Sequence, residues 1–215
     1  MPVHLFDRQQ LPAMPWKNGG GVTREIVCQP PGAGMDAFDW RVSIAHIASN
    51  GPFSRFAQVD RVITLLEGAG VHLHSSDGAV DHRLDRPWVP FAFSGEAPVQ
   101  GDLIAEDCHD FNVMTRRGRC RARVVVVREG GSLPHTVEGL VMALAGRWQL
   151  TSASSALSDS SGLRAGVGTD LDTFWALTAN QGLWWQDGGG PVELRPDAQH
   201  GPGALLAVSI EREHA

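Results

Sequence analysis

The sequence predicts an all-β protein with few short helices, on three observations. Apolar and polar residues alternate with a period of two along most of the chain, which is the spacing of a strand with one buried face. Gly and Pro, at 25 and 13 of the 215 residues, interrupt these runs and mark turns. Hydrophobic residues make up 42% of the chain, enough for a sizeable core. Short strands separated by turn signals are typical of a β-barrel or β-sandwich.

The first half contains several strand signals. Residues 40–45 (WRVSIA) alternate, and residues 61–66 (RVITLL) form a second β-rich run. The latter reaches the turn signal Glu67–Gly70 and resumes at residues 71–74, so we predict a hairpin there. Four consecutive valines predict that residues 121–127 form a buried strand.

Two other segments carry weaker signals. Residues 76–78 (SDG) are a further turn signal, and residues 87–93 contain two prolines, which suit an edge strand. In the second half, residues 152–161 are serine-rich and predict a surface loop. The remaining strands are expected at residues 140–145, 147–151, 174–177, 183–186, 192–195 and 204–210.

The stretch Glu129–Pro134 (EGGSLP) is the best boundary between two halves. We therefore divide the chain into residues 1–128, which carry the most distinctive motifs, and a smaller half of residues 129–215 packed on the first. The two halves are expected to form one compact unit with a continuous core. We find no clean sequence repeat across the boundary.

Charge and cysteine content exclude several classes of function. The net charge of -6 argues against non-specific nucleic-acid binding and against a polybasic membrane anchor. Three cysteines without Cys-x-x-Cys spacing predict neither a disulfide framework nor a zinc ribbon. The sequence shows no signal-like segment and no apolar run of about 18 residues. We expect a cytoplasmic protein that binds neither nucleic acid nor a membrane.

The most unusual segment is Pro15–Ile26 (PWKNGGGVTREI). Its glycines lie beside Lys17, but no Gly-Lys-Ser or Gly-Lys-Thr follows, so we reject a phosphate-binding loop. Two interpretations remain equally supported. The segment is either a flexible loop that enters a strand, or a loop whose backbone passes close to another group, with Lys17 and Asn18 as polar contacts.

This segment resembles the opening signature of the HutD/Ves family. The resemblance continues through residues 40–45, 51–56 (GPFSRF), 60–68 (DRVITLLEG) and 110–117 (DFNVMTRR). These motifs lie between residues 14 and 128, and the second half is similar in texture only. The resemblance implies a bicupin fold, and for some members a link to histidine utilisation with a regulatory, ligand-sensing role. It brings no established enzymatic activity.

Strand parity suggests a pocket. Polar residues share one face in several predicted strands, whereas Trp40, Val42 and Ile44 take the opposite face of theirs. A solvated outer face is the ordinary explanation for such alternation. The family resemblance favours a pocket, since these residues lie in the matched segments. The candidate ligand-binding residues are Lys17, Asn18, Thr23, Glu25, Arg41, Ser43, Arg61, Asp110 and Asn112.

The chemistry of this set favours a small carboxylate ligand, because arginine binds carboxylates in bidentate geometry. Glu25 and Asp110 are expected to hold the arginines in place or to accept hydrogen bonds from an amide or imidazole of the ligand. A buried structural ion-pair network is the rival interpretation.

A metal site is disfavoured. His72 and His74 have the His-x-His spacing common in cupin enzymes, but no Glu follows at the required place. Neither His82 nor His109 completes a diagnostic set of three or four ligands. We interpret His72 and His74 as outward-facing residues that flank a core Leu73, and we expect neither a metal nor another cofactor.

The preferred function is binding of a small anionic metabolite with a regulatory role, and the resemblance implies a ligand such as urocanate or N-formylglutamate. The alternative is a cupin-type enzyme, an isomerase or hydrolase, acting on the same kind of ligand. The lack of a Gly-x-Ser-x-Gly elbow weakens a hydrolase. A third interpretation is a protein-interaction module with a vestigial pocket. A homodimer is left open.

Overall fold

The computed structural model describes residues 3–134, 136–152, 174–188, 190–191 and 193–213. Within these residues four antiparallel sheets account for the strands, and one 3-10 turn, η1 (Ala198–His200), is the only helical element. The prediction of an all-β fold with few short helices is confirmed. No helix in the described part of the chain is long and apolar enough to cross a membrane.

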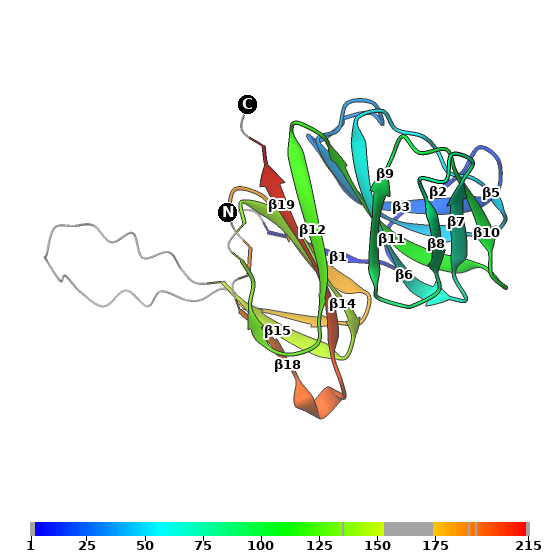
Figure 1. The fold of residues 1–215 in the computed structure, drawn as a ribbon. Helices are drawn as coiled ribbons and strands as arrows, with labels where there is room; N and C mark the ends of the chain where they lie inside the picture. The colour runs from blue at the N-terminus through cyan, green and yellow to red at the C-terminus, as the bar shows by residue number, and fades with distance from the viewer. Residues whose placement is uncertain (1–2, 135, 153–173, 189, 192, 214–215) are drawn as a thin grey trace, which may run out of the picture.

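Two of the sheets face each other and form the N-terminal sandwich (Figure 1). The six-stranded sheet has the order β2 (Ala13–Pro15), β3 (Gly21–Gln29), β4 (Trp40–Ile47), β11 (Cys108–Arg116), β6 (Val59–Gly68) and β9 (Pro90–Ser94). Its four-stranded partner has the order β5 (Gly51–Pro52), β10 (Val99–Leu103), β7 (Val71–Ser75) and β8 (Asp81–Leu84).

The other two sheets form the C-terminal sandwich. The five-stranded sheet has the order β1 (Val3–Asp7), β17 (Gln181–Trp185), β14 (Glu138–Ala145), β19 (Ala204–Arg212) and β12 (Cys120–Val127). The second four-stranded sheet has the order β13 (Gly131–Ser132), β18 (Glu193–Pro196), β15 (Arg147–Thr151) and β16 (Phe174–Thr178).

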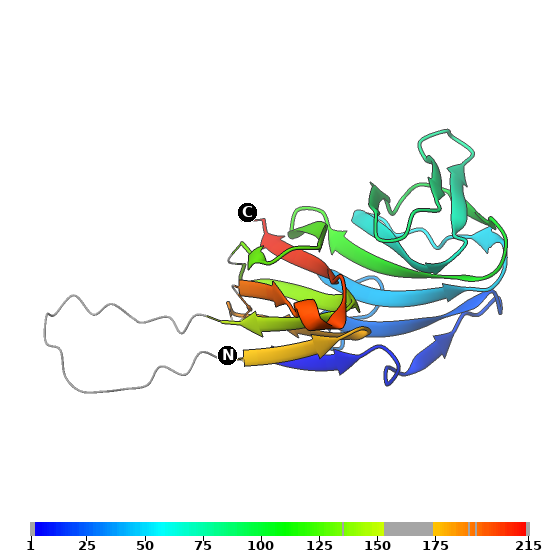
Figure 2. The same cartoon turned by 90° about the horizontal axis from the view of Figure 1, so that it is seen from below.

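A shared apolar core joins the two sandwiches, which lie side by side in Figure 2. Trp40 and Phe111 of the six-stranded sheet pack with Leu140 and Leu206 of the five-stranded sheet, and all four are fully buried. Because strand side chains alternate between faces, this packing leaves the other face of β4 and β11 directed into the N-terminal sandwich. The inter-sandwich core therefore fixes which residues face the interior where the candidate site lies.

Sheet membership crosses the boundary expected near residue 128. β1 and β12 precede that boundary in sequence, yet both pair within the five-stranded sheet of the C-terminal sandwich. The C-terminal sandwich thus takes strands from both sides of the boundary, whereas all strands of the N-terminal sandwich precede it, and β1 and β12 tie the halves together.

The predicted hairpin at residues 61–74 is wrong. β6 pairs with β11 and β9, whereas β7 pairs with β10 and β8 in the facing sheet. Gly68 and Gly70 lie between them with φ of 93° and 94°, so the chain turns a corner from one sheet to the other. A turn signal shows where a strand ends, but non-local pairing decides which sheet the next strand joins.

The burial predicted for residues 121–127 is also incorrect. They lie in β12, at the edge of the five-stranded sheet, where Arg121 and Arg123 are exposed and the valines are only half-buried. β-branched residues predicted the strand correctly, but not its place in the sheet.

Two other local predictions are confirmed: β9 is an edge strand, and residues 76–78 lie in the β7–β8 turn. The serine-rich loop expected at residues 152–161 falls outside the described residues except for Ser152.

The corner glycines provide a test of this arrangement. In Gly70→Ala, the new Cβ would collide with the carbonyl oxygen of Leu84 at a backbone φ of +94°. We expect the free energy of unfolding to fall by about 2 kcal/mol or more in urea denaturation. Gly78→Ala is the control, because Gly78 also has positive φ (+72°) but no atom within 4 Å of a new Cβ. Equal losses of stability in the two variants would contradict a crowded corner at Gly70.

Candidate functional site

A cavity of about 750 Å³ lies inside the N-terminal sandwich. One wall is the inner face of β3, β4, β6 and β11, and Gly101 of β10 lies on the opposite side. An apolar core containing Ile63, Leu65 and Leu73 fills the rest of this interior. The cavity is lined by all the candidate residues predicted from the sequence except Glu25.

The register of the strands brings the polar residues together. Met114 of β11 pairs with Arg41 on one side and with Arg61 on the other, so the two arginines occupy one row across the sheet. In the next row Asn112 pairs with Ser43. The shared face predicted from strand parity for Arg41 with Ser43, and for Asp110 with Asn112, is confirmed, and it is the inner face of a sandwich.

Arg61 is the most constrained cation of the cavity, with a residue exposure of 7%. Its Nε and Nη2 donate to Oδ1 of Asn112 at 3.2 and 2.8 Å. The guanidinium carbon lies 5.3, 5.9 and 5.0 Å from the ring centroids of Phe53, Phe56 and Phe93. Burial lowers the pKa of Arg61 to about 10; Asp110 opposes this shift, and the charge of Arg41 adds to it. Arg61 therefore remains charged at neutral pH.

Arg41 is held by a different kind of partner. Its Nε donates to Oε2 of Glu25 at 2.7 Å, and its Nη1 donates to Oγ of Ser43 at 3.2 Å. Glu25 lies on β3 beside Ser43 and is the candidate residue that does not line the cavity. It positions the Arg41 guanidinium, as expected for one of the two carboxylates.

Asp110 does not hold an arginine directly, which corrects the expectation for the second carboxylate. Its Oδ1 accepts a hydrogen bond from Nδ2 of Asn112 at 2.6 Å, so Asn112 stands between Asp110 and Arg61. Its Oδ2 is buried and has no hydrogen-bond partner among the described residues. Burial raises the pKa of Asp110 to about 7, although the Asn112 hydrogen bond and the Arg61 charge oppose the rise.

The glycine-rich segment contributes Lys17, Asn18 and Gly20 to the cavity lining, and its backbone passes close to other residues of the protein itself. A Cβ at Gly20 would lie 2.9 Å from Oγ of Ser49, and one at Gly21 would lie 3.2 Å from the Trp16 ring. Asn18 Oδ1 accepts from the Gly20 N–H at 3.0 Å, so this amide shapes the loop.

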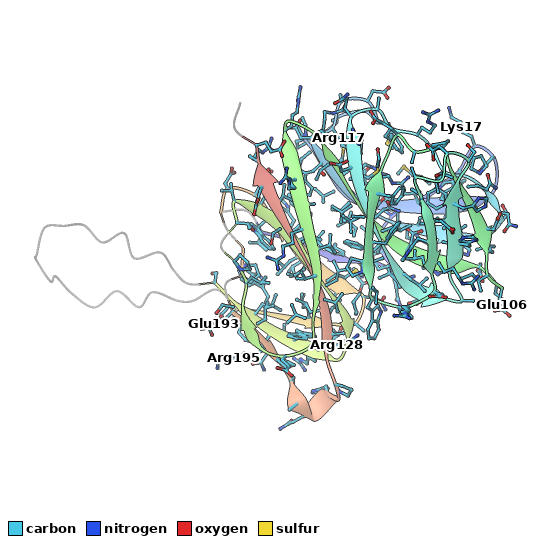
Figure 3. All side chains as sticks on the ribbon, in the orientation of Figure 1. Lys17, Glu106, Arg117, Arg128, Glu193 and Arg195 are labelled. Atoms are coloured by element: carbon cyan, nitrogen blue, oxygen red, sulfur yellow. The ribbon has the colours of Figure 1, made fainter. Side chains whose placement is uncertain are left out.

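Lys17 is exposed on this loop. Figure 3 shows it in the N-terminal sandwich, at the opposite end of the molecule from Glu193 and Arg195 of β18. Thr23 accepts a hydrogen bond from the Trp16 indole at 2.7 Å, and both residues line the cavity.

The apolar part of the lining was missed from the sequence. It includes Met14, Trp16, Met35, Phe53 and Phe56. Phe53 and Phe56 belong to the quoted segment GPFSRF, so their positions were available as a signal. Met35 lies in the loop between β3 and β4, and its sequence surroundings give no such signal.

The histidine pair lies apart from this cavity. Leu73 is fully buried, whereas His72 and His74 project from the other face and pair with Asp81 and Asp102 at 2.7 and 2.8 Å. The interpretation of these histidines as outward-facing is confirmed. The cavity lining offers one carboxylate and no imidazole or thiolate, a donor set that does not fit a transition metal. Across the described residues, no three His, Cys, Asp or Glu side chains form a group that could hold a metal ion.

The HutD family model matches residues 8–199. The chain belongs to the HutD family. The sequence-based resemblance to HutD/Ves is thereby confirmed.

Relatives of this HutD-family protein include two proteins named Ves. The one from Cronobacter sakazakii is 40% identical over 193 residues, covering 89% of this chain and 92% of that protein. The one from Citrobacter koseri is 41% identical over 199 residues, covering 92% and 91%.

Solved structures of similar fold support membership of the HutD family. HutD from Pseudomonas fluorescens SBW25 superposes with a TM-score of 0.74 at 28% identity, covering 98% of this chain and 100% of that one. A conserved protein of unknown function from Pseudomonas aeruginosa gives a TM-score of 0.76 at 31% identity, covering 98% and 100%. Oxalate decarboxylase from Lactobacillus farciminis superposes with a TM-score of 0.60 at 10% identity, covering 97% of this chain and 88% of that one. At this identity the similarity concerns the fold alone. The HutD-family chain is a bicupin-like β-sandwich protein.

The raised pKa of the buried Asp110 carboxyl predicts that the stability of the protein depends on pH. Because Asp110 keeps its proton in the folded state up to about pH 7 and loses it near pH 4 when unfolded, its presence lowers stability as pH rises between these values. Asp110→Asn removes this contribution. We expect the difference in free energy of unfolding, variant minus wild type, to increase by up to about 1.4 kcal/mol per pH unit as pH rises across that window.

Urea denaturation at a series of pH values measures this difference. Asp187→Asn, at an exposed position in the turn after β17, is the matched control and should follow wild type. A constant difference between wild type and Asp110→Asn at all pH values would contradict the raised pKa.

Proposed function

We propose that this HutD-family protein binds a small carboxylate metabolite in the cavity of its N-terminal sandwich, with a regulatory role in histidine utilisation. The observation that carries the proposal is a pair of buried guanidinium groups, Arg41 and Arg61, that line one cavity in the same row of a sheet. Buried charges of like sign favour an anion between them.

The charge balance of the site supports an anionic ligand. Arg41 has Glu25 as its counter-ion, whereas the hydrogen-bond acceptor of Arg61 is the neutral amide of Asn112. Burial raises the pKa of Asp110 to about 7, so this carboxyl supplies only part of a negative charge at neutral pH. The part of the cavity lined by Arg41 and Arg61 therefore carries excess positive charge, which a ligand carboxylate offsets.

Hydrogen-bonding capacity also remains at the guanidinium groups. Among the described residues, Nη1 of Arg61 and Nη2 of Arg41 donate to no protein acceptor. These groups supply N–H donors for carboxylate oxygens, and arginine presents such donors in a fixed plane. Oδ2 of Asp110, which belongs to the same lining, is a further polar atom without a partner among the described residues.

The size and shape of the cavity are consistent with a ligand larger than a simple anion. A volume of about 750 Å³ lies within the range of small-molecule sites, about 300–1,000 Å³. Trp16, Phe53 and Phe56 provide flat apolar surface for a planar group, such as the imidazole ring of urocanate. N-formylglutamate is a second candidate with carboxylates and an amide. The link to histidine utilisation rests on family membership.

A catalytic function on the same ligand is the second candidate, and one observation favours it. A carboxyl with a pKa of about 7 inside a cavity has the property of a general acid or base. The lining contains no nucleophile paired with a base in hydrogen-bond contact, which favours binding. Incubation of urocanate or N-formylglutamate with the protein, followed by NMR, separates the two: an unchanged ligand supports binding, and a new product supports an enzyme.

Arg61→Lys tests the proposal. Lysine keeps the charge but loses the planar fork, so it cannot maintain both the Asn112 contact and a bidentate contact with the ligand. Loss of a desolvated charged hydrogen bond, worth about 1.5–3 kcal/mol, should weaken the affinity for the best ligand at least about tenfold. Isothermal titration calorimetry with urocanate and N-formylglutamate measures this change.

Arg121→Lys is the matched control, because the Arg121 side chain is 77% exposed on the edge strand β12. It should bind as wild type does. Urea denaturation of both variants establishes that each is folded. Unchanged affinity in a folded Arg61→Lys protein would argue for a purely structural role of Arg61.

A further inference from the structure

Asp110 is a buried titratable group. Binding of a ligand by the two arginines does not explain its role. It is fully buried on the central strand β11 and is among the residues that line the cavity. Its Oδ1 is occupied by the Asn112 amide, but its Oδ2 has no partner among the described residues. A carboxylate oxygen buried without a hydrogen bond is costly, so this oxygen needs either a proton or a ligand.

No cation bonds Asp110 directly. The Arg61 donors Nε and Nη2 go to Asn112, and the Arg41 donors Nε and Nη1 go to Glu25 and Ser43. Within the described part of the chain, no ion pair includes Asp110. The carboxyl group thus lies near positive charge without being fixed in its ionised form.

A ligand carboxylate at the two arginines would lie close to Asp110, because Asn112 bonds both Arg61 and Asp110. Two carboxylates close together in a poorly hydrated site cannot both ionise readily, and one proton shared between them relieves the repulsion. The protonated Oδ2 then donates a hydrogen bond to the ligand and is no longer unpartnered. The proton comes from solvent, and no covalent bond of the ligand changes.

We propose that Asp110 shares a proton with the bound carboxylate, so that ligand binding is coupled to proton uptake and is favoured by lower pH. This inference rests on the proposed function and adds to it: the site recognises a carboxylate together with a proton. Asp110 then contributes to specificity, because it favours ligands whose carboxylate is placed to accept its hydrogen bond.

The other groups around Asp110 do not replace it as the source of this pH dependence. Arg61 on β6, with a pKa lowered to about 10 by burial, remains charged throughout the neutral range. Glu25 on β3 is paired with Arg41, and Cys108 on β11 has its pKa raised to about 12 by burial and by the charges of Asp110 and Asp107. Thr23, Ser43 and Asn112 do not titrate near neutral pH. The facing sheet contributes Gly51, Pro52 and Gly101, which have no titratable side chain.

The sign of the linkage follows from the burial of Asp110. Burial already raises its pKa to about 7 in the free protein, and a second carboxylate raises it further in the complex. Below about pH 7 Asp110 is protonated in both states, and the affinity is constant. Between the two pKa values the association constant falls by up to about tenfold per pH unit, because binding then requires a proton.

The test is calorimetry with N-formylglutamate and with cinnamate, the phenyl analogue of urocanate, because neither probe has an imidazole and their carboxylates are ionised throughout the neutral range. Titrations in MOPS and in Tris at the same near-neutral pH give the number of protons taken up, from the difference in buffer ionisation enthalpy. We expect a fraction of one proton per site and weaker binding at higher pH. Asp110→Asn should bind with no proton uptake and no pH dependence, while the control Asp187→Asn should retain both.

The outcomes are distinguishable. Binding without proton exchange in wild type overturns this inference and leaves the proposed function standing. Proton release with tighter binding at higher pH also overturns it, and assigns Asp110 as an ionised acceptor. Binding of neither probe overturns the proposed function and this inference together. The wild-type titration decides the sign even if Asp110→Asn does not fold.

Discussion

The burial of the Arg61 guanidinium is the constraint on which the rest of the site depends. A charge placed inside a sandwich is tolerated only with hydrogen-bond partners and polarisable surroundings. Asn112 supplies the acceptor, and the rings of Phe53, Phe56 and Phe93 surround the guanidinium carbon. The core shared by the two sandwiches fixes the inner faces of β4 and β11, and this places Arg41, Asn112 and Asp110 in the same interior.

The neutral amide of Asn112 separates the charges of Arg61 and Asp110, and this leaves both groups able to contact a ligand. A direct Arg61–Asp110 pair would satisfy both charges and leave little reason for a ligand. Asn112 instead accepts from Arg61 with its oxygen and donates to Asp110 with its nitrogen. Arg61 therefore keeps a free N–H donor, and Asp110 keeps a free oxygen, for hydrogen bonds to a ligand. The geometry differs in this respect from the self-contained buried ion-pair network that was the rival interpretation of the sequence. The pair of Arg41 with Glu25 is closer to that structural type.

Strand parity and family-like segments were enough to select residues that line one cavity, because a period of two assigns side chains to faces wherever the strands are correct. They could not show that Asn112 separates Asp110 from Arg61, since that contact depends on side-chain torsions across β6 and β11. Met35 was missed because a loop has no periodicity. The hairpin proposed at residues 61–74 failed for a related reason: Gly68 and Gly70 mark a change of direction, but pairing with β10 and β11 decides the sheets.

The most direct test of a carboxylate site at the paired arginines is a crystal structure of the protein with urocanate or N-formylglutamate at a saturating concentration. The account predicts ligand density in the cavity of the N-terminal sandwich, with a carboxylate oxygen within about 3 Å of Nη1 of Arg61 or Nη2 of Arg41. An empty cavity in a crystal whose protein binds the ligand in solution, or a ligand bound outside this cavity, would contradict it.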